Sequence, residues 1–233
     1  SIIHIEDVKS ELSGSIFHNN TVDLNFACEG QELIAVMKHT PEHLKSIYSS
    51  FQANGKLSCE GNIKGLVSKG INPALNMSCH IDKGNLNLKS QPFILKRVSL
   101  DGKITNGDEQ NFRKTKIEIT KFDAKTENGF IKGDFTLQNL NKYYLTASLN
   151  SSWDLAEINH YFEDSPFFNL QGKLLANTQY SGYISFDSKF KNYFLAAKHN
   201  STTSFENASF TYKNFPLNFH FQNADCAFKN NNI

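Results

Sequence analysis

The chain has 233 residues, of which 39% are hydrophobic and 20% are charged, and its formal net charge is +1. This is enough sequence for a substantial core in one or two domains. Charges of both signs are scattered, so no basic stripe indicates binding to nucleic acid or to an anionic membrane surface. No window approaches the roughly 18 consecutive apolar residues of a membrane-spanning helix.

Alternating apolar and polar residues, together with 20 Phe and 8 Tyr, predict mainly strands. In the N-terminal part, the first alternating run covers 22–28. A short helical turn is expected over 32–37. A helix is then expected to begin at Thr40, with Pro41 in its first turn. Its apolar stripe at helical spacing consists of Leu44, Ile47, Tyr48 and Phe51.

Further alternating runs follow at 75–81, 131–137, 143–149 and 217–221. Turns are expected between these runs at 83–85, 105–108, 127–129 and 139–141. Two of these turns contain Asn-Gly, at 106–107 and 128–129, which is the strongest short-range signal for a hairpin.

A second helix is expected after the run at 143–149. Asp154 and Glu157 have the spacing of a capping box, in which the first side chain caps the helix and the second reaches back. The apolar stripe of this helix consists of Leu155, Ile158, Tyr161 and Phe162.

An internal repeat of about 117 residues organises the chain. Gly55-Lys56-Leu57 recurs as Gly172-Lys173-Leu174, and each copy follows an expected helix. No Pro/Gly/Ser-rich linker and no low-complexity tract interrupts the sequence, which predicts one continuous β-rich region over 1–233 rather than separable domains. It divides into the second half of a unit (1–54), a full unit (55–171) and the first half of another (172–233).

The predicted fold is therefore mainly β: a curled, elongated antiparallel sheet with two or three short helices, built from about two repeats. The apolar face of this sheet either lines an open groove or forms the core of a closed sandwich or barrel, and the residues alone leave both open. The residues expected on this face are Leu75, Met77, Cys79, Ile81, Ile117, Ile119, Phe135, Leu137, Leu217, Phe219 and Phe221.

No motif indicates catalysis, a metal or a cofactor, and we expect none of these functions. His39-Thr40-Pro41-Glu42-His43 matches a zinc-peptidase pattern, but Pro41 should begin the helix and leave His39 outside it. The four cysteines, Cys28, Cys59, Cys79 and Cys226, form no Cys-x-x-Cys pair. They are interpreted either as small buried hydrophobic residues or as disulfide partners.

The order of the motifs resembles the AsmA family of Gram-negative envelope proteins, in the long form found in Bacteroidetes. The resemblance rests on the helix, the Gly-Lys-Leu strand, Asn72-Pro73-Ala74-Leu75-Asn76-Met77 and Lys83-Gly84-Asn85-Leu86-Asn87-Leu88. The segments 119–124, 129–135 and 219–232 fit the same pattern, so the resemblance spans essentially the whole chain.

This resemblance implies a periplasmic segment of a protein that is held in the inner membrane by a helix outside residues 1–233. It implies an apolar groove that carries phospholipid, or another acyl-chain lipid, between the inner and outer membranes and maintains the outer membrane. It supplies no catalytic or metal residues, and it leaves the envelope protein partners unknown. The alternative from the residues alone is a non-enzymatic structural or adhesive β-sandwich repeat of the cell envelope.

Overall fold

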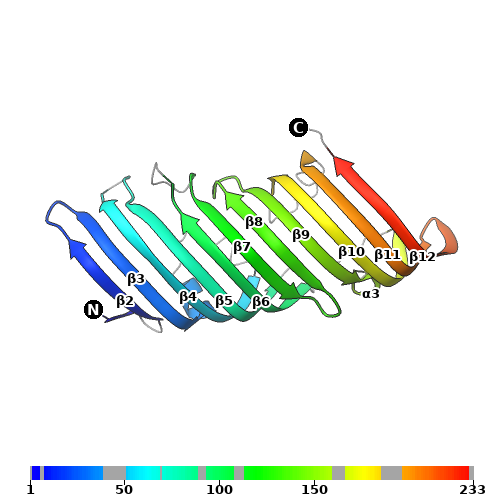
Figure 1. Ribbon diagram of the computed structural model, residues 1–233, viewed down its shortest axis with the longest axis horizontal. Coiled ribbons are helices and arrows are strands. Elements are labelled where there is room, and N and C mark those ends of the chain that lie inside the picture. Colours follow the sequence, from blue (N-terminus) through cyan, green and yellow to red (C-terminus); the bar gives the residue numbers. More distant parts are fainter. Residues whose placement is uncertain are drawn as a thin grey trace.

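The computed structural model describes residues 2–5, 8–38, 51–68, 70–88, 93–107, 113–158, 166–184 and 196–230. These residues form one antiparallel sheet of twelve strands, in which each strand pairs with its neighbours in the chain. The first and last strands do not pair with each other, so the sheet is open. Figure 1 shows the strands side by side along the long axis of the molecule.

The first six strands are β1 (Ile2–Ile5), β2 (Val8–Ile16), β3 (Thr21–Glu32), β4 (Phe51–Leu66), β5 (Ala74–Leu88) and β6 (Phe93–Thr105). The other six are β7 (Lys116–Lys125), β8 (Phe130–Gln138), β9 (Tyr144–Asp154), β10 (Phe167–Tyr183), β11 (Lys198–Tyr212) and β12 (Phe215–Asn230). Two short helices lie within the described residues: α1 (Leu33–Lys38) follows β3, and α3 (Leu155–Ile158) follows β9.

The main features expected from the alternation are confirmed. The chain is mainly β and antiparallel, and each alternating run lies in a strand except for Tyr143, which precedes β9. The turn over 127–129 joins β7 to β8 and is closed by the amide of Thr126, which donates to the carbonyl of Gly129 over 3.2 Å. The turn over 139–141 joins β8 to β9, and Asn139 adopts a φ of 57° there. Asparagine tolerates this left-handed conformation better than most residues.

Two local predictions are wrong. Residues 83–85 are not a turn, because β5 continues through them and Lys83 adopts a φ of 53° at a break in the register with β6. The Lys-Gly-Asn signal therefore marks a β-bulge, which uses the same left-handed backbone as many turns. Phe51 is not part of a helix but begins β4, where pairing with β5 overrides the helical spacing.

The helix predictions are partly tested. The turn over 32–37 corresponds to α1. Asp154 caps α3, because its carboxylate accepts a hydrogen bond from the amide of Ala156 over 2.9 Å. The rest of the two expected helices, including the helix start at Thr40 and the positions of Tyr161 and Phe162, lies outside the described residues.

A row of bulges crosses β3 to β6 near the end of the sheet where α1 lies. A left-handed residue accompanies a break in register in each of these strands: Gly30 in β3, Gly55 in β4, Lys83 in β5 and Arg97 in β6. The bulge in β10 and β11, with Gly172 and Asn207, lies at the corresponding end near α3. Bulges bend a strand and increase its twist, so this end of the sheet is bent across successive strands.

Candidate functional site: the apolar face of the sheet

The cross-strand register gathers apolar side chains into rows on one face of the sheet. One row runs through Leu12, Phe26, Gly61, Met77, Ile104, Ile117, Leu137 and Leu145. The next row on the same face runs through Cys28, Cys59, Cys79, Gly102, Ile119, Phe135, Ala147 and Tyr180. We call the surface that contains these two rows the apolar face.

Eight of the eleven residues expected from the sequence come together on this face. They are Leu75, Met77, Cys79 and Ile81 of β5, Ile117 and Ile119 of β7, and Phe135 and Leu137 of β8. Ile117 is paired with Leu137, and Ile119 with Phe135. Ile119 and Leu137 are only 5% and 8% exposed, whereas the other six are half-buried.

The remaining three candidates lie apart, on the last strand of the sheet. Leu217 and Phe221 of β12 are 56% and 39% exposed, and Phe219 is half-buried. Phe219 stacks on Phe210 of β11 at a ring-centroid distance of 5.1 Å, and Phe210 also contacts Phe167 of β10 at 5.1 Å. Phe219, Phe210 and Phe167 therefore form a separate aromatic cluster. Strand alternation alone did not predict that this cluster lies apart from the rows of the apolar face.

Some residues of the apolar face were not among the candidates. Phe122 contacts the ring of Phe135 edge-on at 5.8 Å, and Ile104 lies between Met77 and Ile117. The signal for Ile104 was its alternation with Lys103 and Thr105. The register break between Ile119 and Phe122 hides the signal for Phe122, because the bulge changes the parity of the strand.

Glycines make room for large side chains on the apolar face. A Cβ on Gly61 would lie 2.8 Å from the ring of Phe26, and one on Gly102 would lie 2.5 Å from the end of the Ile119 side chain. These side chains therefore lean across the glycine of the neighbouring strand. Each contact joins neighbouring strands within one row.

Coverage of the apolar face is limited within the described residues. Each strand packs mainly on its two neighbours in the sheet, while α1 packs on β3 and β4, and α3 on β9 and β10. The clusters of buried apolar residues are small: one is centred on Leu95, Val98 and Ala124, and another on Ala147, Tyr180 and Ala197. No second sheet of described residues covers the two rows of the apolar face. The described part of the chain therefore does not form a closed two-sheet sandwich.

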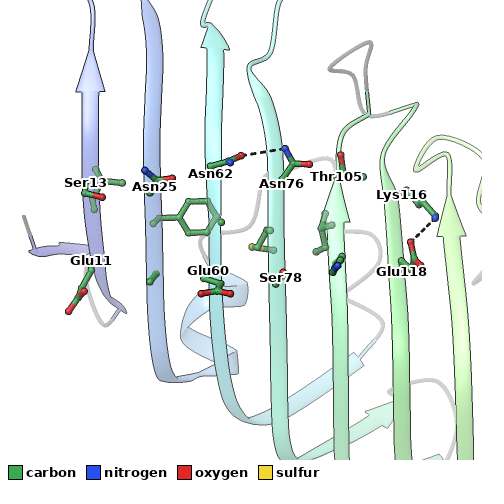
Figure 2. A pocket seen from close by; sticks show the side chains of 17 residues that line it. Glu11, Ser13, Asn25, Glu60, Asn62, Asn76, Ser78, Thr105, Lys116 and Glu118 are labelled. Atoms are coloured by element: carbon green, nitrogen blue, oxygen red, sulfur yellow. Dashed lines mark hydrogen bonds and ion pairs between the residues drawn. The ribbon is translucent and has the colours of Figure 1, made fainter.

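The opposite face of the sheet is polar and is hollowed. A depression of about 1030 Å³ lies over β2 to β7, and Figure 2 shows the polar side chains around it. Asn76 donates to Asn62 across two of these strands over 3.3 Å, and Lys116 lies 2.6 Å from Glu118. The hydrogen bond and charge of Lys116 lower the pKa of Glu118. The polar side chains of this depression lie on the face opposite the apolar rows, but Leu12, Phe26, Gly61, Met77 and Ile104 of the first row also line it.

Cys59 and Cys79 of the apolar face are poor nucleophiles as free thiols. Burial, followed by the contact with Cys28, raises the pKa of Cys59 to about 12. Burial, followed by the charge of Asp101, raises the pKa of Cys79. At neutral pH both side chains are held as thiols, and the thiolate is the reactive form.

The described residues contain no group of three or more His, Cys, Asp or Glu side chains placed to hold a metal ion. His80 lies 2.6 Å from Asp101 on the polar face, as a pair without a third ligand of this kind. The segment with His39 and His43 lies outside the described residues.

Comparison with known proteins gives no relative. No protein-family model matches the chain, and no curated protein or solved structure is significantly similar to it. Among the described helices, none has the length and apolar character needed to cross a membrane.

Proposed function

We propose that this chain is a periplasmic segment of an AsmA-like envelope protein, whose apolar face holds the acyl chains of phospholipid during transfer between the inner and outer membranes. The observation that carries the proposal is the pair of apolar rows on a single-layer sheet, whose Leu, Ile, Met and Phe side chains are mostly only half-buried. The protein itself would perform no chemistry, and the proposal requires no cofactor.

The physical reason is the hydrophobic effect. Moving an acyl chain into water costs about 0.8 kcal/mol per methylene, which is on the order of 10 kcal/mol for a chain of about 16 carbons. An acyl chain that lies on the apolar rows avoids part of this cost. It also shields from water the half-buried side chains of the rows. Because the rows continue from β2 to β9, the affinity would be spread along the sheet instead of being concentrated in one deep pocket.

We infer that the sheet is curled and that its units repeat. Since the hollow over β2 to β7 lies on the polar face, the acyl chains in this proposal lie along the apolar rows of the other face. The row of bulges near α1 supports the curl, because each bulge bends its strand at the same end of the sheet. The repeat is supported by Gly55 and Gly172, which have φ angles of 129° and 98° near the start of the two strands that follow helices. A membrane anchor, in this proposal, lies in a part of the protein outside residues 1–233.

Lipid uptake by a matched pair of variants tests the proposal. Met77 and its neighbour Ser78 lie on the same strand but on opposite faces. The wild-type chain, incubated with vesicles of phosphatidylethanolamine and phosphatidylglycerol and re-isolated, should carry phospholipid in native mass spectrometry. Met77→Asp should lose at least about tenfold in bound lipid, because a charge on the apolar face opposes acyl-chain contact, whereas Ser78→Asp should bind normally.

Circular dichroism of both variants would establish that they remain folded. A wild-type chain that takes up no phospholipid would contradict the proposal and favour a structural role in the envelope. Loss of binding in Ser78→Asp with retention in Met77→Asp would also contradict it, because the lipid would then occupy the polar face.

A further inference from the structure

Three cysteines occupy one row of the apolar face on three adjacent strands. Cys28 of β3 is paired with Cys59 of β4, and Cys59 is paired with Cys79 of β5. The sulfur atoms of Cys28 and Cys59 are 2.8 Å apart. All three side chains are half-buried, so small molecules can reach this row from the open side of the sheet.

The backbone at this pair suits a covalent bond. Residues directly opposite each other in antiparallel strands have Cα atoms about 4.5–5.5 Å apart, within the range of about 4.4–6.8 Å found in disulfides. The sulfur atoms are only about 0.8 Å farther apart than in an S–S bond of about 2.05 Å. No movement of the strands is needed to close this difference, because side-chain rotation is sufficient.

The neighbouring bulge fixes the position of the pair. Cys28 and Cys59 form the last regular pair before the break in register at Gly30, which has a φ of 59°. The amide of Gly30 donates to the hydroxyl of Ser58 over 3.1 Å, and this bond ties the bulge of β3 to β4. The two cysteines are therefore held opposite each other by both the sheet and the bulge.

We propose that Cys28 and Cys59 form a disulfide on the apolar face when the chain is in an oxidising compartment, while Cys79 and Cys226 remain thiols. This inference stands independently of the lipid-transfer proposal. The contact between Cys28 and Cys59 selects this pair over Cys59 and Cys79, for which only the register is favourable.

The reaction is a two-step exchange with a dialkyl disulfide such as oxidised glutathione. The thiolate of one cysteine attacks the oxidant, forms a mixed disulfide and releases one thiolate, which takes up a proton. The thiolate of the second cysteine then attacks the protein sulfur of the mixed disulfide and releases the second thiol. Two electrons and two protons pass from the protein to the oxidant, and one S–S bond replaces another.

The environment of Cys79 protects the product from rearrangement. Burial and the charge of Asp101 raise the pKa of Cys79, so, as at Cys59, exchange through its thiolate is slow at neutral pH and the pair whose sulfur atoms are already in contact is favoured. The bond would close a loop whose ends are 31 positions apart and which contains α1 and the whole connection between β3 and β4. Closing a loop of this length restricts the unfolded chain and raises stability.

The test uses the wild-type chain after equilibration with oxidised glutathione. Free thiols are alkylated, the protein is digested without reduction, and the peptides are identified by mass spectrometry. The expected product is a peptide pair joined through Cys28 and Cys59, with Cys79 and Cys226 alkylated. Recovery of all four cysteines as alkylated thiols, or a bond between Cys59 and Cys79, would overturn the proposal.

A thermal measurement gives a second and independent result. Oxidised wild type should melt roughly 5–10 °C above the reduced form. Cys79→Ser, the matched control in the same row, should keep this difference, whereas Cys28→Ser should lose it. An equal response of the two variants to oxidation would contradict the assignment.

Discussion

At the scale of single residues, Glu157 illustrates how one side chain joins two segments that are about 30 positions apart in the chain. It is 7% exposed and belongs to α3, yet its carboxylate accepts hydrogen bonds from the turn between β7 and β8. The donors are the amide of Glu127 at 2.9 Å, the amide of Asn128 at 3.3 Å and the hydroxyl of Thr126 at 3.2 Å. The two carboxyl oxygens of Glu157 thus satisfy backbone donors that the tight turn leaves unpaired.

Replacement of Glu157 should therefore destabilise the chain. Glu157→Ala should lower the free energy of unfolding by about 1–3 kcal/mol, because buried donors lose their acceptor. Glu157→Gln, which keeps one carbonyl oxygen, should lose less. Urea denaturation measures both. Glu206→Ala, at an exposed position of β11, is the control and should stay within about 0.5 kcal/mol of the wild type. Equal stabilities of all four proteins would contradict this role.

Sequence spacing indicated part of this interaction and missed the rest. Asp154 and Glu157 have the spacing of a capping box, and the capping hydrogen bond of Asp154 is confirmed. The contact of Glu157 with residues 126–128 could not be predicted, because the two segments are about 30 positions apart and meet only once β8 and β9 have paired.

At the scale of elements, the bulge at Gly55 shows why glycine recurs at the start of the long strands. Its φ of 129° is a conformation that residues with a side chain rarely adopt. A Cβ at this position would also lie 2.6 Å from the Cα of Gly84 in β5. Two glycines therefore allow β4 and β5 to approach each other at the bend.

Gly55→Ala should therefore lower the free energy of unfolding by more than backbone strain alone would. Gly70 provides the comparison, because it also has a positive φ of 82° but has no atom within 4 Å of an added Cβ. We expect Gly70→Ala to cost about 1 kcal/mol and Gly55→Ala at least about 2 kcal/mol of unfolding free energy. Urea denaturation with a constant m-value distinguishes them. Equal losses would mean that the close approach to Gly84 is relieved without cost.

The elements also show which sequence signals are reliable. Alternation located the strands around Met77, Phe135 and Leu145, because each has one face toward apolar neighbours. The turn signal was wrong at Lys83, and the helical spacing was wrong at Phe51. A bulge and a turn share the same left-handed backbone, and the partner strand that holds Phe51 in β4 is remote in sequence. Period alone also could not separate the aromatic cluster of β12 from the apolar face.

At the scale of the whole molecule, the order of strands makes stability local. Each strand pairs only with its chain neighbours, so the chain resembles a linear array in which every element depends on the adjacent ones. The apolar rows add contacts between neighbouring strands but do not join distant parts of the sheet. Among the described strands, the first and the last each pair with one other strand.

Hydrogen exchange should reveal this local stability as a gradient of amide protection across the sheet of the unmodified chain. Amides of the central strands β5 to β9 should be protected most, and those of β1 and β12 least, because an edge strand can open without disturbing the others. Mass spectrometry of peptides after exchange in deuterated buffer measures the profile. Uniform protection from β1 to β12 would show instead that the sheet opens only as a single cooperative unit.

The sequential pairing of the strands also determines how such a sheet can change in length during evolution. Neighbouring strands lie about 4.8 Å apart, so one inserted hairpin would extend the sheet by about 10 Å. Because a hairpin contributes two strands, the chain direction and the two faces on either side of the insertion are preserved. The distance spanned by the sheet can therefore be adjusted in steps of one hairpin.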